Sequence, residues 1–94
     1  MKLIWAQSAI DDLDAIREYI SQDSPPAACR VLGEIRTGVI DALQHPKAGR
    51  PGRVEGTREI VLTKLPYTMP YRLNGDRVEI LRVYHQSRKW PDEL

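Results

Sequence analysis

The short sequence Ser24-Pro25-Pro26 limits the possible folds more than any other feature of this chain. On both sides of it, over residues 13–20 and 28–43, apolar residues recur at intervals of three and four, which is the spacing of one face of an α-helix. Serine caps the free amides of a helix start, and proline is tolerated at the first helical position because its missing N–H would be unpaired there. We therefore predict helices over about residues 8–23 and 25–45 that form an antiparallel hairpin.

Local signals predict where these helices begin and end. Ser8 followed by Asp11 has the form of a capping box, so the first helix is expected to start at Ser8. Pro46 ends the second helix, because proline disfavours helical geometry in the residue before it. Gly33 and Gly38 each lower helix stability by about 1 kcal/mol relative to alanine, and a close approach to the first helix would explain them.

The remaining segments are predicted to be strands. Pro70 inside one of them indicates an irregular pairing or a bulge, because proline cannot donate a hydrogen bond to a neighbouring strand. Asn74-Gly75 predicts a tight turn between the last two strands. The segments with strand composition are residues 2–6, 58–65, 67–73 and 78–85. The expected fold is α+β, with an N-terminal strand and a two-helix hairpin packed on one face of a mainly antiparallel four-stranded sheet whose other face stays open.

Length and composition indicate one domain over residues 1–94 with no internal disulfide. Apolar residues make up 41% and charged residues 29% of the chain, as in ordinary globular proteins. The single cysteine, Cys29, is expected to be a small buried filler and points to a reducing, cytoplasmic location. No signal peptide or membrane span is expected. Phosphate-binding loops, dinucleotide fingerprints and zinc-ligand patterns are absent from the sequence, so neither a metal nor a cofactor is expected.

Positive charge gathers in the second half of the chain. Residues 1–45 hold four Lys/Arg and seven Asp/Glu, a net charge of −3, whereas residues 46–94 hold ten and six, a net charge of +4. Several of these cations lie in the glycine-rich segment Gly49-Arg50-Pro51-Gly52-Arg53, which is predicted to be a loop. Such a loop is either a solvated surface loop or one that faces an anion or an acidic partner.

A second group of polar residues lies near the end of the last strand. Arg82, Tyr84, His85 and Arg88 are residue types that can move protons and stabilise charge during cleavage of RNA. The same residues can equally form a salt-bridging rim with no catalytic role. The sequence alone leaves both interpretations open.

Many short motifs follow one another in an order found in a known superfamily. They are Trp5, Ala9 with Asp12-Leu13, Pro46, residues 49–53, Gly56-Thr57-Arg58-Glu59, Pro66-Tyr67, Tyr71-Arg72, residues 78–83 and Arg88-Lys89-Trp90-Pro91. With these motifs, the whole chain resembles the RelE/ParE toxins of bacterial type II toxin–antitoxin systems. The resemblance implies a toxin with a plasmid-stabilising or stress-response role.

The resemblance also bears on the choice between the two branches of the superfamily. RelE-type nucleases place two lysines where this chain has Glu59 and Val61, and an arginine where it has Thr68. They carry a tyrosine near the C-terminus, where this chain has Leu94, so that only Arg88 matches. The resemblance therefore favours a ParE-like toxin that inhibits DNA gyrase or another topoisomerase by binding. The alternative is a RelE/YoeB-like, ribosome-dependent mRNA endoribonuclease that uses His85, Tyr84, Arg82 and Arg88, and a third is an inactive protein that only binds an antitoxin.

All of these alternatives share one partner, a cognate antitoxin encoded in the same operon. We expect a toxin–antitoxin hetero-oligomer in which acidic residues of the antitoxin meet the arginines of the toxin. The antitoxin is expected to cover the open sheet face and the arginine-bearing loop. Residues expected to contact the antitoxin or the target are Arg50, Arg53, Arg58, Arg72, Arg82, Arg88, Lys89 and Trp90.

Overall fold

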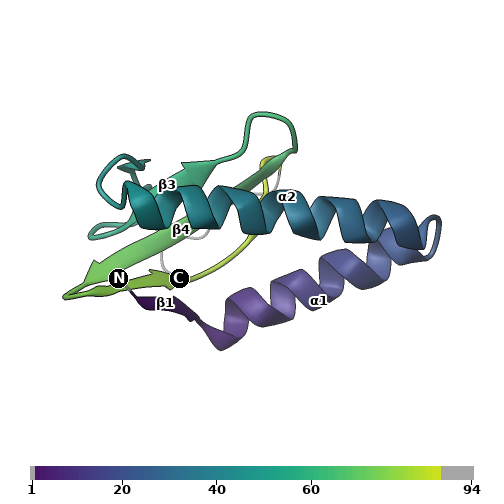
Figure 1. Ribbon diagram of the computed structural model, residues 1–94, viewed down its shortest axis with the longest axis horizontal. Coiled ribbons are helices and arrows are strands. Elements are labelled where there is room, and N and C mark those ends of the chain that lie inside the picture. The colour runs from purple at the N-terminus through teal and green to yellow at the C-terminus, as the bar shows by residue number, and fades with distance from the viewer. Residues whose placement is uncertain (1, 88–94) are drawn as a thin grey trace.

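The computed structural model describes residues 2–87, which form two helices and a six-stranded sheet (Figure 1). The elements are β1 (Lys2–Trp5), α1 (Gln7–Ser21), α2 (Pro25–Gln44), β2 (Arg50–Pro51), β3 (Arg58–Val61), β4 (Tyr67–Asn74), β5 (Arg77–Ile80) and β6 (Tyr84–His85). The sheet order is β1-β5-β4-β3-β2, and β6 pairs with β4. Only β1 and β5 run parallel; the other pairs are antiparallel.

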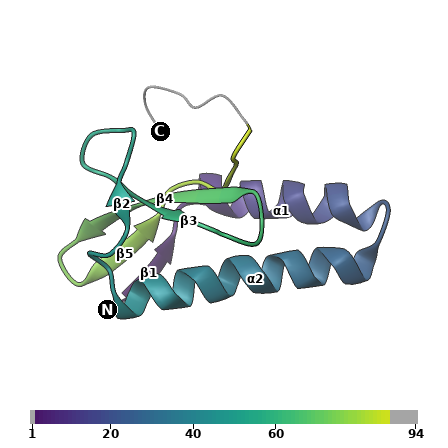
Figure 2. The ribbon, with the colours of Figure 1, turned by 90° about the horizontal axis from the view of Figure 1, so that it is seen from above.

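The two helices form the predicted hairpin and cover one face of the sheet (Figures 1 and 2). Their shared corner extends beyond the strands, so the far ends of α1 and α2 pack mainly on each other. The α+β fold class is thus confirmed. The sheet differs from the expected one in two ways: β2 is an additional strand of two residues, and the last expected strand is divided so that its end forms the two-residue strand β6.

A side-chain cap is present at the start of α2, as predicted, but not at the start of α1. Ser24 is the N-cap of α2, and its Oγ accepts a hydrogen bond from the backbone N–H of Ala27 at 3.3 Å. The prediction that Ser8 caps α1 is wrong, because α1 already begins at Gln7 after Ala6, which makes no side-chain cap. The Asp11 carboxylate instead accepts a hydrogen bond from the Gln7 side chain at 2.9 Å.

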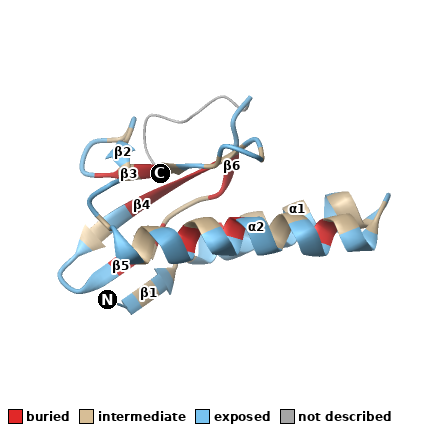
Figure 3. Cartoon of the chain, turned by 45° about the horizontal axis from the view of Figure 1, so that its top comes forward, coloured by how far each residue is buried: buried red, intermediate tan, exposed pale blue. Residues whose placement is uncertain are grey.

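The core lies between the helix hairpin and the inner face of the sheet. Figure 3 shows the buried residues along the centres of β3, β4 and β5 and on one side of α2. Fully burying an aliphatic or aromatic side chain stabilises a fold by about 1.5–3 kcal/mol, so a few such residues stabilise this interface. The buried core cluster consists of Ala9, Ile35, Val39, Met69, Tyr71, Val78, Ile80 and Val83.

Gly38 allows α2 to approach the sheet, not the first helix. A Cβ atom added at Gly38 would lie 2.6 Å from Cδ2 of Leu62, which follows β3. At Gly33, nothing lies within 4 Å of an added Cβ. The expectation that both glycines permit a close approach to α1 is therefore wrong.

The bulge predicted from Pro70 is present. Tyr71 lies opposite Ile80, and Thr68 lies opposite Tyr84. The chain advances three residues from Thr68 to Tyr71 on β4 but four residues from Ile80 to Tyr84 on the returning side. The extra residue on the returning side defines a bulge. The expected strand over residues 78–85 is divided by this bulge into β5 and β6.

The sheet face away from the helices is less open than predicted. Strand alternation places Glu59, Thr68 and Pro70 on this face. All three are buried, with at most 2% of their surface exposed. Arg50 and Arg72 lie on the same face and are exposed. Its buried polar residues and exposed arginines make this face a candidate functional site.

Candidate functional site

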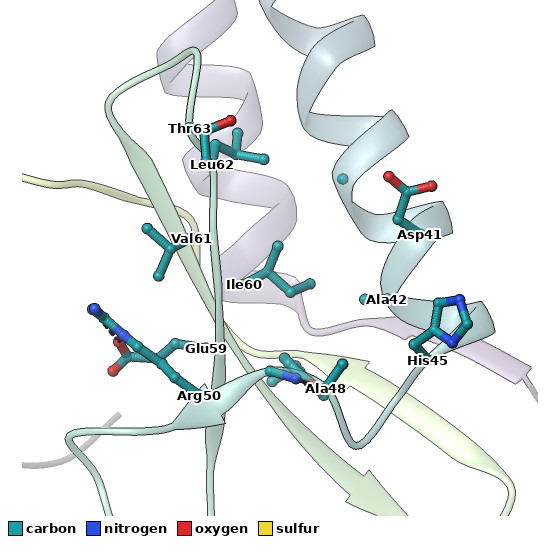
Figure 4. Close-up of a pocket in the computed structure, with 13 residues that line it drawn as sticks. Asp41, Ala42, His45, Ala48, Arg50, Glu59, Ile60, Val61, Leu62 and Thr63 are labelled. Atoms are coloured by element: carbon teal, nitrogen blue, oxygen red, sulfur yellow. Dashed lines mark hydrogen bonds and ion pairs between the residues drawn. The ribbon is translucent and has the colours of Figure 1, made fainter.

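A buried carboxylate fixes the arginine-bearing loop. Glu59 Oε1 accepts hydrogen bonds from Arg50 Nε and Nη2 at 2.9 and 2.8 Å, and its Oε2 accepts one from the backbone N–H of Arg53 at 2.9 Å. The Glu59 side chain is 1% exposed and that of Arg50 is 49% exposed. Figure 4 shows the two side chains together beside β2. The loop is therefore held to β3 by a charge that has been removed from water.

Tyr71 holds the other end of the same loop. Its hydroxyl donates a hydrogen bond to the Pro46 carbonyl at 2.7 Å and accepts one from the Gly49 N–H at 3.2 Å. A Cβ atom at position 49 would collide with this hydroxyl, so the close approach requires glycine. Burial raises the pKa of Tyr71, against the lowering effects of the Gly49 hydrogen bond and the Arg58 charge. Arg58 Nη1 also donates to the carbonyls of Lys47 and Gly49 at 2.9 and 3.1 Å.

A second ionic cluster is built around the bulge. Asp12 of α1 accepts hydrogen bonds from Arg82 Nε and Nη2 at 2.8 and 3.0 Å and from the backbone N–H of Val83 at 2.9 Å. The Arg82 guanidinium also lies over the ring of Tyr84, 4.7 Å from its centre. The hydrogen bond to Asp12 is the main cause of the raised pKa of Arg82. Arg82 thus joins α1 to the sheet.

The residues predicted for RNA cleavage are only partly brought together. Arg82 and Tyr84 are in contact, and Tyr84 is buried. His85 is exposed, and its side chain leaves β6 on the other side from Tyr84 because neighbouring residues alternate along a strand. His85 Nδ1 lies 2.7 Å from Ser87 Oγ, and its ring meets that of Tyr67 edge to face at 5.6 Å. Arg88 lies outside the described residues.

The predicted binding arginines that lie within residues 2–87 are distributed over more than one part of the surface. Arg50 and Arg72 lie on the sheet face away from the helices, whereas Arg58 pairs opposite Tyr71 and reaches back to the loop. Arg53 is exposed in the loop. Arg82 is held by Asp12, and Lys89 and Trp90 lie outside the described residues, as Arg88 does. Of the set, Arg50, Arg53 and Arg72 share the region around the loop and the sheet.

Three residues that organise this region had no predicted role: Glu59, Tyr71 and Asp12. Tyr71 and Asp12 act through partners at least 22 residues away in the sequence. Glu59 binds Arg50, nine residues before it, and an acid on a strand that follows a basic loop is the signal that could have drawn attention to it. Within the described part of the chain, no group of three or more His, Cys, Asp or Glu side chains is placed to hold a metal ion. No helix among residues 2–87 is long and apolar enough to cross a bilayer. The exposed position of Cys29 shows that its expected role as a buried filler is wrong.

Comparison with known proteins finds a matching toxin family and similar toxins. The family described as "ParE toxin of type II toxin-antitoxin system, parDE" matches residues 3–90. The protein Y4kP of Sinorhizobium fredii is 45% identical over 93 residues, which cover 99% of this chain and 96% of that protein. Toxin RelE2 of Caulobacter vibrioides is 34% identical over 87 residues, which cover 93% and 97% of the two chains.

A solved structure supports the same relationship. It is described as the chromosomal ParDE toxin–antitoxin system from P. aeruginosa, and one of its chains superimposes with a TM-score of 0.80 at 33% identity. The match covers 90% of this chain and 95% of that one. Because the family matches residues 3–90 and the fold agrees over nearly the full length of both chains, the chain belongs to the ParE toxin family of type II toxin–antitoxin systems.

Proposed function

We propose that this toxin acts by binding, with DNA gyrase or a related topoisomerase in the cytoplasm as its target, and that a cognate antitoxin from the same operon neutralises it. The proposal rests on the burial and pairing of the Glu59 carboxylate. In the resemblance to RelE-type nucleases, this position corresponds to a phosphate-facing lysine. Here it holds a buried carboxylate that is already paired with Arg50.

The surroundings of Glu59 also favour binding over catalysis. The neighbouring outward position on β3 is the apolar Val61, so this part of the strand offers no cation to a phosphodiester. Removing a group that stabilises the transition state typically slows a reaction by about 10²-fold or more. Arg82, the remaining described arginine of the alternative nuclease site, is committed to Asp12. A toxin without these contacts has to act through recognition of a macromolecule.

A supercoiling assay tests the proposed target. Purified toxin added to gyrase and relaxed plasmid is expected to abolish supercoiling and to trap DNA that is cleaved after denaturation of the enzyme. Toxin premixed with its antitoxin is expected to have no effect. Unchanged supercoiling at a large molar excess of toxin would contradict the proposal. Cleavage of ribosome-bound message that is lost in His85→Ala would support the nuclease alternative instead.

The antitoxin is proposed to lie across the arginine-bearing loop and the adjoining sheet face. Arg53 and Arg72 are both exposed on this side of the molecule. A further contact is available beside β1, where an apolar cavity of about 440 Å³ opens between α1 and α2. Ile10 and Ile40 at its rim are 39% and 42% exposed. An antitoxin segment with acidic and apolar residues would match both surfaces.

Charge reversal on the loop side tests this placement. The double variant Arg53→Glu/Arg72→Glu is expected to bind the antitoxin about tenfold more weakly and with less dependence on salt, because two attractive rim charges become repulsive. Isothermal titration at two salt concentrations measures both effects. The control Arg30→Glu/Lys64→Glu changes the net charge equally at exposed positions away from this face and is expected to leave affinity unchanged. Equal affinities of the two double variants would refute the placement.

A further inference from the structure

A groove runs between α2 and β3 on the side of the molecule away from the Asp12–Arg82 cluster. It consists of two adjoining cavities of about 500 and 220 Å³, which share Gly38, Asp41, Leu62 and Thr63. Its floor is apolar, since Ile60 and Leu62 face α2 at this point (Figure 4). Gly38 keeps the floor accessible along the helix, because it presents only hydrogen where another residue would meet Leu62.

One wall of the groove is a stretch of strand edge that no other strand within residues 2–87 pairs with. The backbone N–H of Leu62 donates to the Tyr67 carbonyl at 3.1 Å, toward β4, so alternation turns the N–H and C=O of Val61 away from β4. On that outer side of β3, β2 pairs with only Arg58 and Glu59. The residue that would continue the pairing opposite Val61 is Ala48, whose N–H donates instead to the His45 carbonyl at 2.9 Å. Val61 therefore presents an open position for strand addition.

The opposite wall of the groove, formed by α2, carries negative charge. Asp41 lines both cavities and Glu34 lines one, and both residues are exposed on α2. Among residues 2–87, no side chain forms an ion pair or hydrogen bond with the Asp41 carboxylate. Arg50 also lines the groove, but its charge is matched by Glu59, and Lys64 lies at the far end. His45 and the negative C-terminal end of the α2 dipole complete this wall.

We propose that this groove binds an extended basic segment of a protein other than the antitoxin, added as a strand to β3. The backbone of such a segment would pair with Val61, its alternate apolar side chains would contact Ile60 and Leu62, and a Lys or Arg would reach Asp41. The exclusion of the antitoxin rests on the proposed function, in which the antitoxin brings acidic residues to the arginine-bearing loop. A basic segment therefore belongs to a different chain, such as the target.

Peptide binding to the purified full-length toxin tests the proposal. The probe is a short fluorescein-labelled peptide that alternates lysine and valine, with a glutamate–valine peptide as its acidic counterpart, measured by fluorescence anisotropy. The basic peptide is expected to bind and to shift the NMR amide signals of Val61 and Leu62, whereas the acidic peptide is not. The toxin–antitoxin complex is expected to bind the basic peptide as the free toxin does.

Two matched pairs of variants locate the contact. Val61→Pro removes only the outward N–H, a position where sheets accept proline, and is expected to weaken binding about fivefold, while Val61→Thr keeps the N–H and the affinity. Asp41→Lys is expected to weaken binding about tenfold, and Glu18→Lys, an equal charge change on exposed α1, to leave it unchanged.

Three results would overturn the proposal: equal affinities of Val61→Pro and Val61→Thr, equal affinities of Asp41→Lys and Glu18→Lys, or loss of peptide binding in the antitoxin complex. If circular dichroism shows that Val61→Pro does not fold, the Asp41→Lys and Glu18→Lys pair decides. The peptide assay contains no gyrase, so its outcome is independent of the supercoiling test.

Discussion

Replacing Arg50 with methionine is expected to lower the free energy of unfolding by about 3 kcal/mol, because it leaves the Glu59 carboxylate buried without its counter-ion. The hydrogen bond from the Arg53 N–H would remain on this side chain, which is 1% exposed. Urea denaturation of the purified toxin measures the loss. Exposed surface arginines usually contribute far less, so the size of the effect distinguishes an anchor from a rim charge.

A second substitution and a control make this prediction specific. Glu59→Gln added to Arg50→Met is expected to recover most of the lost stability, because the buried group is then neutral and still accepts from Arg53. Arg72→Met, at an exposed arginine on the same face, is expected to change stability by less than about 0.5 kcal/mol. Equal losses in Arg50→Met and Arg72→Met would show that Glu59 does not depend on Arg50.

The elements that the sequence predicted correctly are those whose cause is local. Ser24 and Pro25 act within one turn of helix, and a tight turn follows β4 as predicted, with Gly75 at φ of 62°. The central residues of that turn are Gly75-Asp76 and not Asn74-Gly75, because Asn74 still pairs with Arg77. Pro70 marks the bulge because its missing N–H weakens the pairing at that position. In each case a few neighbouring residues contain all the physical information that is needed.

The features that the sequence did not predict depend on contacts between distant segments. β2 lies in a glycine-rich loop without apolar periodicity, and it pairs with β3 where Glu59 binds Arg50. Asp12 and Arg82 are 70 residues apart, and their pairing follows only from the packing of α1 beside the bulge. The groove between α2 and β3 likewise requires the strand register, because the register ends the pairing of β2 at Glu59 and leaves the outer edge of Val61 unpaired within residues 2–87. Fold class was therefore predictable, whereas the ion pairs that hold the loop and the groove proposed to bind a basic segment were not.

Replacing Asp12 with alanine is expected to lower the free energy of unfolding by about 3 kcal/mol. The change removes three hydrogen bonds, two of them between charged groups, at side chains that are only 12% and 26% exposed. Hydrogen bonds to charged groups contribute about 1.5–3 kcal/mol, and the N–H of Val83 would lose its acceptor inside the bulge. Hydrogen exchange is expected to show faster exchange at Val83, together with the stability loss in urea.

Two further variants separate the anchoring role of Asp12 from its charge. Asp14→Ala removes an acid from the same helix. Asp14 pairs with Arg17, and both side chains are 59% exposed, so the change is expected to alter stability by less than about 0.5 kcal/mol. Asp12→Asn keeps one acceptor for the Val83 N–H, so its loss of stability is expected to lie between the losses in Asp12→Ala and Asp14→Ala. Because the bulge positions β6, Asp12→Ala should also weaken antitoxin binding if the antitoxin crosses this face, whereas Asp14→Ala should not. A loss of stability in Asp12→Ala no larger than that in Asp14→Ala would mean that the bulge is held by the β4 pairing alone.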